Sequence, residues 1–340
     1  MQAKMQGMMD RLRVGQLLLT LPSDGPLRTG RQAAQQKGKL HSRERDQSVV
    51  SFHYDLSNEY FALWLDPRMV YSCAYFESPE DDLAKAQVRK LDYVCRKLRL
   101  QPRETLLDIG SGWGGLIIHA AKYYGVHATG VTLSQEQGKL AMERIRDAGL
   151  QGRCRVLIRD YRDVEEELGY DKLVSVGMFE HVGVDHLPEY FEKGWRLLKP
   201  GGVFLNHGIS SSYEHSKRPV SQFIMKYVFP DGDLTPISTA LRASEEAGFE
   251  VRDVESLREH YVLTLRHWVR RLEEVRDEAV RLTDEVTYRV WRLYMSASAN
   301  GFRVGRYNLH QALLLKPHKD GRSGLPLTRE DWYEAPVLSE

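Results

Sequence analysis

Cysteine is scarce, long apolar runs are missing and the net charge is close to zero in this chain of 340 residues. Its three cysteines, Cys73, Cys95 and Cys154, form no CxxC pair, which indicates a reducing compartment and argues against a zinc site. No window reaches the roughly twenty apolar residues of a membrane-spanning helix, and the apolar run at residues 17–19 is too short for the core of a signal peptide. A net charge of +1 gives no footprint for nucleic-acid binding. We therefore expect a cytoplasmic protein whose contact with membranes is at most peripheral.

The remaining composition is that of a globular protein, with 42% hydrophobic and 28% charged residues, and the length suffices for one large core. Residues 1–50 differ from the rest, because they combine a Met-rich start with Pro, Gly and a basic run. We interpret them as a mobile or loosely docked arm. The main domain is expected at residues 51–317, and an irregular tail at residues 318–340.

The most informative stretch runs from Leu106 to Gly115, where an apolar strand leads through Asp108 into a glycine-rich turn that opens a helix. Gly110 and Gly112 let the backbone turn sharply and approach a ligand without Cβ interference, and the helix that follows offers free N–H groups at its start. This pattern predicts a site for a nucleotide-like cofactor. On the loop alone, a dinucleotide site or a tight turn without any ligand stays open.

Three further apolar strands alternate with helical segments, at residues 127–132, 156–161 and 172–177. The alternation predicts an α/β fold with a doubly wound, mostly parallel sheet, whose ligands bind across the carboxyl ends of the strands. The first of these strands ends in Thr132, Leu133 and Ser134, where a dinucleotide site places Asp or Glu, and this argues against nicotinamide. The next one ends in Asp160 and Tyr161, an acceptor and an aromatic ring.

Outside this core, the pattern indicates three additions to the sheet. A helical, aromatic segment at residues 51–100 is expected to lie over the sheet as a lid. Aromatic, helical insertions at residues 210–234 and 258–300 are typical of a substrate pocket. A fifth strand after Gly201-Gly202, a return near residues 248–251 and a last strand at 311–316 complete the predicted sheet.

Residues 261–294 have the pattern of one long amphipathic helix rich in arginine. Its apolar stripe is explained by packing on the core with a solvated outer face. The alternative is contact with anionic lipid headgroups through Arg266, Arg270, Arg271 and the basic arm.

Two polar residues fall at the carboxyl ends of neighbouring strands. Glu180 follows the fourth strand and His207 ends the fifth. Either alone has a plain explanation, since Glu180 could cap the next segment and His207 could be a satisfied core residue. Together they indicate proton chemistry, because these strand ends lie close in this topology. Cys73 lacks a local basic partner, which argues against a thiolate mechanism and leaves packing or ligand contact.

Aromatic residues surround Cys73 in the sequence, and they include Tyr54, Phe61, Trp64, Tyr75 and Phe76. They can wall an apolar pocket, stabilise a cation through their π faces, or simply pack in the core.

Seven motifs occur in a fixed order along the chain: His53-Tyr-Asp-Leu, Tyr71-Ser-Cys-Ala-Tyr-Phe, Leu107-Asp-Ile-Gly-Ser-Gly-Trp-Gly-Gly, Gly130-Val-Thr-Leu-Ser, Asp160-Tyr-Arg-Asp, Val174-Ser-Val-Gly-Met-Phe-Glu-His-Val-Gly and His260-Tyr261. In this order they resemble the cyclopropane fatty acid synthase family, over residues 51–316. Its members are S-adenosylmethionine-dependent methyltransferases related to the mycolic acid cyclopropane synthases. The resemblance implies the class I methyltransferase fold.

For function, the resemblance implies transfer of the methyl group of S-adenosylmethionine to a cis double bond in an unsaturated phospholipid acyl chain. Bicarbonate-assisted deprotonation would then close a cyclopropane ring. Three alternatives stay open: a fatty-acid methyltransferase that leaves a methyl or methylene branch, a small-molecule N-methyltransferase, and a non-catalytic lipid-binding protein. Contact with an anionic membrane surface is expected, and a homodimer is left open.

The resemblance also implies residue roles. Cofactor contacts would come from Tyr71, Ser72, Asp108, Gly110, Gly112, Thr132, Leu133, Gln137, Asp160 and Tyr161. Among these, Tyr161 would flank the adenine, and Asp160 would accept a hydrogen bond from its amino group. The bicarbonate ion would be held by Cys73, Glu180, His207 and Tyr261, with the backbone near Val176.

The chain departs from the family pattern at three places. Arg162 stands where some relatives carry an acidic adenine contact, and Ser111 replaces a common cysteine between the two glycines. The segment before His53 is short, whereas bacterial members often have a substantial N-terminal domain.

Overall fold

The computed structural model describes residues 33–34, 38–54, 56–167, 169–215 and 221–333. Contacts divide the chain into two units, Met1–Gly30 and Arg31–Glu340, and every described residue belongs to the second unit. The strands of this part are β1 (Thr105–Ile109), β2 (His127–Thr132), β3 (Cys154–Ile158), β4 (Tyr170–Val176), β5 (Leu198–Ser211), β6 (Glu250–Ser256) and β7 (Tyr307–Leu315).

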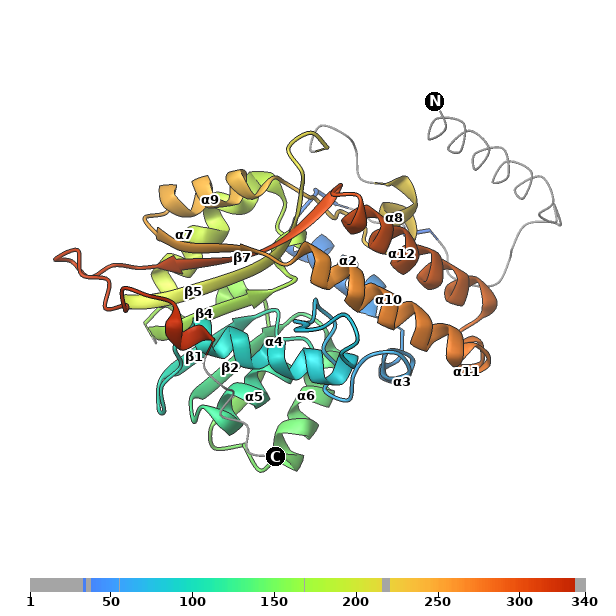
Figure 1. Cartoon of the computed structure of the whole chain (residues 1–340), viewed down its shortest axis with the longest axis horizontal. Helices are drawn as coiled ribbons and strands as arrows, with labels where there is room; N and C mark the ends of the chain where they lie inside the picture. Colours follow the sequence, from blue (N-terminus) through green and yellow to red (C-terminus); the bar gives the residue numbers. More distant parts are fainter. Residues whose placement is uncertain (1–32, 35–37, 55, 168, 216–220, 334–340) are drawn as a thin grey trace. The chain divides into compact units, whose positions relative to one another are not determined.

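These strands form one sheet in the order β3-β2-β1-β4-β5-β7-β6. Strands β1 to β5 pair in parallel, whereas β7 is antiparallel to both β5 and β6 (Figure 1). The predicted doubly wound, mostly parallel sheet is therefore confirmed. The topology reverses direction between β1 and β4, and this is where such sheets bind their ligands.

Helices cover both faces of the sheet. They are α2 (Arg43–Tyr54), α3 (Asn58–Ala62), α4 (Leu83–Lys97), α5 (Gly115–Tyr123), α6 (Gln135–Asp147), α7 (Leu187–Leu197), α8 (Gln222–Tyr227), α9 (Ile237–Glu246), α10 (Arg258–Glu274), α11 (Arg276–Leu282) and α12 (Glu285–Arg303). Figure 1 shows α7 and α9 on one side of the sheet and α4, α5 and α6 on the other, with α10 to α12 beside it. Among the described residues, no helix is long and apolar enough to cross a membrane.

Alternate residues of each strand enter different cores, as the pleat of a strand requires. On β1, Leu106 packs in the core shared with α4, α5 and α6, whereas Leu107 packs in the core shared with α7 and α9. A third, aromatic core lies between α3, α10 and α12, and it includes the fully buried Trp64, Trp268 and Trp291. The helical insertions thus have their own core next to the sheet.

The prediction of one long helix at residues 261–294 is wrong. The structure has α10, α11 and α12 instead, with breaks at Val275 and at Thr283–Asp284. Asp284 adopts an extended conformation, and its carboxylate accepts the N–H of Thr287, which starts a new helix. Helices α10 and α12 therefore fold back on each other as a hairpin, which Figure 1 shows in orange and red.

The segment expected to be a lid contains the end of α2 and the helices α3 and α4, and the last two pack in different places. Helix α3 belongs to the aromatic core, whereas α4 packs on the sheet through residues such as Leu91 and Val94. Residues 43–50, which the sequence analysis placed in the arm, form the first part of α2. Residues 1–32 and 35–37 of that arm lie outside the described residues.

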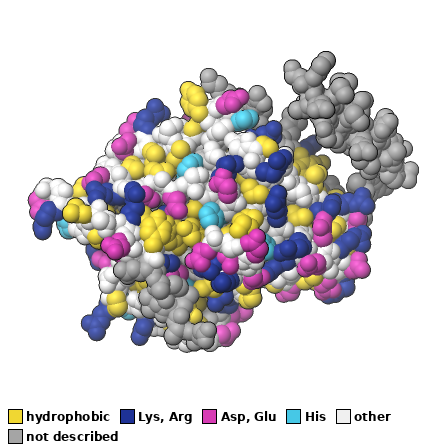
Figure 2. Space-filling view, viewed as in Figure 1, with side chains coloured by type: hydrophobic (Ala, Val, Ile, Leu, Met, Phe, Trp, Pro, Cys, Tyr) yellow, Lys and Arg dark blue, Asp and Glu magenta, His cyan; other side chains and the backbone are white. Residues whose placement is uncertain are grey.

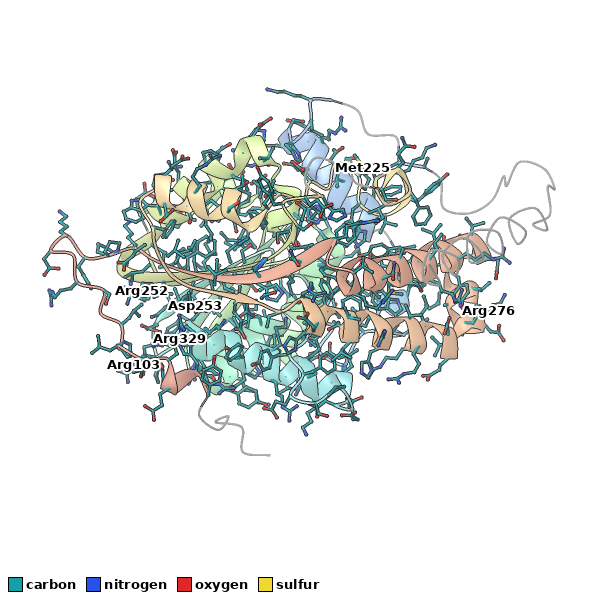
Figure 3. All side chains as sticks on the ribbon, turned by 45° about the horizontal axis from the view of Figure 1, so that its top comes forward. Arg103, Met225, Arg252, Asp253, Arg276 and Arg329 are labelled. Atoms are coloured by element: carbon teal, nitrogen blue, oxygen red, sulfur yellow. The ribbon has the colours of Figure 1, made fainter. Side chains whose placement is uncertain are left out.

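The described part of the tail, residues 318–333, contains only one short 3₁₀ helix, Glu330–Trp332. Trp332 is nevertheless buried in the core with α4, and Arg329 pairs with Asp253 of β6 at 2.8 Å (Figure 3). The described tail is therefore irregular apart from this one turn, and Trp332 and Arg329 are among the residues that attach it to the domain.

Candidate active site

The glycine-rich turn lies at the carboxyl end of β1 and is held against β2. The backbone N–H groups of Gly110 and Ser111 both donate to the carbonyl of Val131, at 3.0 and 2.9 Å. Gly110 and Gly112 have φ angles of +87° and +52°, a region that favours glycine. On β2, a Cβ added to Gly130 would lie 2.4 Å from Oγ of Ser111, so only glycine permits this close approach.

One cavity beside this turn is lined by all the residues that the resemblance implied for the cofactor: Tyr71, Ser72, Asp108, Gly110, Gly112, Thr132, Leu133, Gln137, Asp160 and Tyr161. Local hydrogen bonds hold several of these side chains. The hydroxyl of Thr132 donates to Gln137 at 3.0 Å, and the N–H of Gln137 bonds to the Ser134 hydroxyl at the start of α6. The sheet edge therefore assembles the predicted set into one site, and its contact with a cofactor stays a prediction.

A second cavity adjoins the first, and the two share Tyr71, Ser72, Gly177 and His181 as wall residues. It contains all four residues that the resemblance implied for the anion: Cys73, Glu180, His207 and Tyr261. Its other walls are largely apolar and include Ile209, Ile224, Phe229, Leu234, Leu265, Tyr294, Phe302 and Leu309. A ligand in the first cavity would thus face an apolar space that contains a few polar groups.

Glu180 is buried in the short 3₁₀ helix Phe179–His181. Its Oε1 accepts the N–H of Ile209 at 2.7 Å, while its Oε2 is buried without a partner among the described residues. Burial raises the pKa of Glu180 to about 7, because the charged form loses its hydration. This carboxyl group can therefore hold or accept a proton near neutral pH.

His207 lies on β5, the strand next to β4. It pairs there with Val176, the last residue of β4. Its Nδ1 is 3.1 Å from Nε2 of Gln311, while its Nε2 is buried without a partner among the described residues. Burial lowers the pKa of His207 well below its usual value, with the charges of Lys90 and Lys97 acting in the same direction. The imidazole is therefore neutral.

Cys73 and Tyr261 complete the second cavity from outside the sheet. The Cys73 thiol is fully buried and donates to the carbonyl of Ala74 at 3.3 Å. Burial raises the pKa of this thiol, which agrees with the argument against a thiolate nucleophile. Tyr261 is buried on α10, where its ring packs against Phe302 at 4.7 Å. Val176, by contrast, lines the first cavity, and Gly177 is the neighbouring residue that reaches both.

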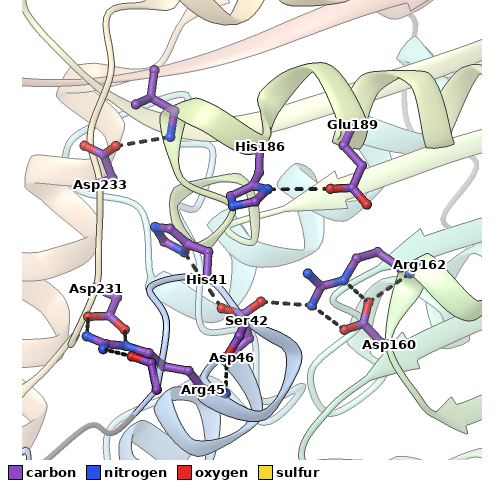
Figure 4. A network of polar contacts seen from close by, with 12 residues as sticks. His41, Ser42, Arg45, Asp46, Asp160, Arg162, His186, Glu189, Asp231 and Asp233 are labelled. Carbon is purple, nitrogen blue, oxygen red and sulfur yellow. Dashed lines mark hydrogen bonds and ion pairs between the residues drawn. The ribbon is translucent and has the colours of Figure 1, made fainter.

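Asp160 lines the first cavity, but both of its carboxylate oxygens accept hydrogen bonds from Arg162. The same guanidinium bonds to Asp46 of α2 at 2.9 Å (Figure 4). Arg162, noted above as a departure from the family pattern, thus neutralises Asp160 and joins it to the N-terminal helix. These bonds use part of the acceptor capacity of Asp160 that an adenine amino group would need.

Helix α2 itself contributes Asp46, Val49 and Val50 to the first cavity, which the sequence analysis did not anticipate. A second contact holds this region, since Arg45 forms a two-point ion pair with Asp231 at 2.5 and 2.6 Å (Figure 4). The only local sequence indication of this role was the alternation of acidic and basic residues in the stretch 43–46.

Lys90 is a further residue of the first cavity that was not predicted from the sequence. This lysine is only 2% exposed, lines the first cavity and donates to the hydroxyl of Ser72 at 2.8 Å. Burial lowers the pKa of Lys90 to about 8, and burial raises that of nearby Asp108 to about 7. Lys90 could have been noticed because it falls on the apolar stripe of α4, between Ala86 and Leu91.

The sheet order, the glycine turn and the two adjoining cavities define the class: this is an S-adenosylmethionine-dependent methyltransferase of the class I fold. The model of the mycolic acid cyclopropane synthetase family matches residues 41–312. The chain belongs to this family, as the order of its motifs indicated.

Individual relatives agree with this assignment. The chain is 46% identical over 298 residues to a probable fatty acid methyltransferase from Pseudomonas putida, covering 87% of this chain and 76% of the relative. It is 39% identical over 282 residues to the cyclopropane-fatty-acyl-phospholipid synthase of Escherichia coli strain K12, covering 83% and 71%. The structure of mycolic acid cyclopropane synthase CmaA1 complexed with SAH and CTAB is similar with a TM-score of 0.75 and 34% identity, over 79% of this chain and 97% of that one.

Proposed function

We propose that this enzyme methylates a cis double bond in the acyl chain of an unsaturated phospholipid and then closes a cyclopropane ring with bicarbonate as the base. The observation that carries the proposal is a pair of buried atoms, Glu180 Oε2 and His207 Nε2. Neither has a partner among the described residues, and both belong to a cavity that is otherwise largely apolar. Such atoms are costly unless a ligand satisfies them, and a small oxyanion beside an acyl chain would do so.

The residues of the two cavities fit the groups that this reaction needs. Asp108 Oδ1 is buried without a partner among the described residues and suits the ammonium group of S-adenosylmethionine. Tyr161 offers a ring for the adenine. When bound, S-adenosylmethionine supplies an electrophilic methyl group, and bicarbonate supplies a base small enough to reach a carbon-bound proton.

The chain's own residues would hold and shield these groups. His207 Nε2 and a protonated Glu180 can each donate a hydrogen bond to a carbonate oxygen, and Tyr261 lines the same cavity. The apolar walls exclude water, which would otherwise trap the alkyl cation as an alcohol. The ring faces of Tyr294 and Phe302 can stabilise positive charge on the acyl chain.

A second candidate is methyl transfer that ends in a methylene branch on the fatty acid. The name of the Pseudomonas putida relative, a probable fatty acid methyltransferase, favours it. Both reactions share the methyl transfer and the cation, and they differ only in how the cation loses its proton. The same pair of cavities serves either outcome.

Mass spectrometry of lipids from cells that express this chain, fed with methyl-deuterated methionine, tests the proposal. Acyl chains that gain one CD₂ unit support the proposed cyclopropane synthesis if the NMR spectrum also shows the protons on the other two ring carbons. A =CD₂ branch on the acyl chain with the same gain, seen in the deuterium or carbon-13 spectrum, would select the second candidate, and unchanged lipids would contradict both. As controls, Glu180→Gln and His207→Ala should bind S-adenosylhomocysteine like wild type and lose most turnover.

We also propose that the enzyme reaches its lipid by docking the outer face of the α10–α12 hairpin on an anionic membrane. A groove on this face is lined by Arg266, Arg270 and Arg303, together with Val269, Glu273, Ser296, Ala299 and Asn300. Glu273 pairs with Arg292 outside the groove lining. Among the described residues, none of the three arginines pairs with a carboxylate. The inner face of the same hairpin walls the second cavity, so one helix layer separates the groove from the acyl site.

Charge on this hairpin is mixed elsewhere. Figure 2 shows Lys and Arg side chains among acidic ones in the region of α10 to α12, and Arg276 lies at the end of the hairpin far from the sheet (Figure 3). Arg276 is paired with Glu285 at 2.8 Å, so its charge is already compensated. The three groove arginines are therefore the ones expected to bind phosphate groups.

Co-sedimentation with vesicles tests the docking surface. Changing Arg266, Arg270 and Arg303 together to Gln should weaken binding to phosphatidylglycerol vesicles and reduce its salt dependence. The matched control changes three exposed or half-exposed arginines elsewhere to Gln: Arg242, Arg252 and Arg322. Both triple variants then have the same net charge. Equal loss in both triple variants would mean that net charge alone, and not this groove, attracts the membrane.

A further inference from the structure

Gln311 on β7 contacts His207 but is not itself among the residues that line the second cavity. The antiparallel pairing of β5 and β7 places the two residues directly opposite each other. Both side chains are 1% exposed, and Gln311 Nε2 lies 3.1 Å from His207 Nδ1. Directly opposed residues of antiparallel strands project from the same face, so the sheet register enforces this contact.

The contact decides which nitrogen of His207 carries the proton. An amide nitrogen only donates hydrogen bonds, so Nδ1 must be the acceptor in this pair. In a neutral imidazole the proton then sits on Nε2. That nitrogen belongs to a residue of the second cavity and is buried without a partner among the described residues. Burial also lowers the pKa of His207 well below its usual value, which removes the doubly protonated form.

We propose that Gln311 is a positioning residue that locks His207 as the Nε2–H tautomer, so that the imidazole presents a permanent hydrogen-bond donor to an oxyanion held beside Glu180. The identity of the anion as bicarbonate rests on the proposed function. The tautomer is a property of the protein alone and can be measured without turnover.

A fixed tautomer of His207 favours binding of the oxyanion for a physical reason. A histidine free to exchange tautomers would present a lone pair to the anion for part of the time, and that arrangement is repulsive. Glu180 Oε1 is already occupied by the N–H of Ile209. Glu180 Oε2 and His207 Nε2 therefore remain available to the oxyanion, and a fixed donor at His207 makes one of these contacts constant.

Nitrogen-15 NMR of histidine-labelled protein tests the inference directly, with His207→Gln to assign the signal. In the wild type, Nε2 should have the chemical shift of a protonated ring nitrogen. Nδ1 should have that of an unprotonated one. In Gln311→Met, which keeps the side-chain length and removes the donor, the two tautomers should mix. In Gln311→Glu, whose carboxylate accepts, the proton should move to Nδ1. A wild-type proton on Nδ1, as an amide turned the other way would give, overturns the inference.

His310→Gln is the matched control, because His310 is the neighbour of Gln311 on β7 and bonds to Ser210 at 2.9 Å. It should leave the His207 signals unchanged. A shift of the His207 tautomer in this control as large as that in Gln311→Met would show that any disturbance of β7 has the same effect, and would also overturn the inference.

A second experiment measures the rate as bicarbonate is added back to a carbonate-depleted buffer. Gln311→Met should raise the bicarbonate concentration for half-maximal rate by about tenfold, because one charge-assisted hydrogen bond is weakened, with the KM for S-adenosylmethionine unchanged. An unchanged bicarbonate requirement together with a mixed tautomer would overturn the role of the lock in anion binding. If wild-type turnover does not respond to bicarbonate at all, the proposed function fails, while the NMR result still decides the tautomer.

Discussion

Lys90 of α4 donates a hydrogen bond of 2.8 Å to the hydroxyl of Ser72, and both residues are buried at the wall of the first cavity. A lysine in such a place is unusual, since burial of an ammonium group costs free energy unless nearby groups compensate it. Here the compensation comes from the hydroxyl and from the charges of Asp66 and Asp108. The pair links the face of α4 that packs on the sheet to the wall of the first cavity.

Replacing Lys90 by Met should weaken cofactor binding without unfolding the protein. Methionine keeps most of the apolar stem, while Ser72 loses its donor and Asp108 loses an opposing charge. We expect about a tenfold loss of affinity for S-adenosylhomocysteine by calorimetry. Lys139→Met is the control, because Lys139 is 62% exposed on α6. Equal affinity of Lys90→Met and wild type would show that Lys90 only fills space.

Glu180→Gln should change how stability depends on pH. The pKa of Glu180 is about 7 in the folded chain and 4.5 in its ordinary state, so the folded protein keeps a proton that the unfolded chain releases in this window. Stability from this group is therefore fully present below about pH 4.5 and is lost as the pH rises through 7. Gln does not titrate, so the variant should gain on wild type by up to about 3 kcal/mol at pH 8.

Urea denaturation of both proteins between pH 4 and pH 8 measures this difference. Gln keeps an acceptor for the N–H of Ile209, so the comparison isolates the titration. Parallel stability curves across the range would contradict the assignment of a raised pKa to Glu180.

Gly130→Ala should disturb the glycine-rich turn from the neighbouring strand. The new Cβ would lie 2.4 Å from Oγ and 2.6 Å from Cβ of Ser111, and the turn must move to relieve this overlap. We expect a loss of about 1–3 kcal/mol in the free energy of unfolding and weaker cofactor binding. Gly152→Ala is the matched control, since an added Cβ there meets nothing within 4 Å. If both variants behave alike, close packing at Gly130 is not what holds the turn.

Arg162→Gln should loosen α2 at the first cavity. It removes the bond to Asp46 and two of the side-chain bonds to Asp160, all in a partly buried setting. Hydrogen exchange of residues 43–54 should become several-fold faster, with faster release of S-adenosylhomocysteine. Arg43→Gln serves for comparison, because its pair with Asp163 is about half exposed on both sides and contributes little. Equal exchange rates in the two variants would contradict the inference that Arg162 holds α2 in place.

Much of the fold was readable because apolar strands and glycine turns are local patterns. The runs around Leu107, Val131 and Val174 became β1, β2 and β4 within one or two residues of the predicted ends. The break between α10 and α12 was missed because Asp284 acts as a helix cap only when its backbone is extended, and the residue type alone does not show that conformation.

The candidate site shows the same division. Glu180 and His207 were accessible because Glu180 follows an apolar strand and His207 lies on the next one, opposite Val176 at the end of β4. Lys90 and Gln311 were not, since their roles depend on which side chain faces them across a helix–sheet or strand–strand contact. Asp160 was predicted as an acceptor for the adenine amino group, and only the structure shows that Arg162 binds both of its carboxylate oxygens.

By itself the sequence determined the order of strands and helices, the glycine turn and the family, because these rest on short-range periodicity and on residue types at fixed spacing. The tertiary structure decided which polar atoms in the described part of the chain are buried without partners in a largely apolar cavity, which side chain faces Nδ1 of His207, and how α2 is joined to Asp160. Those outcomes depend on burial and on contacts between residues far apart in the chain, and no local pattern encodes the electrostatic cost of burying a particular atom.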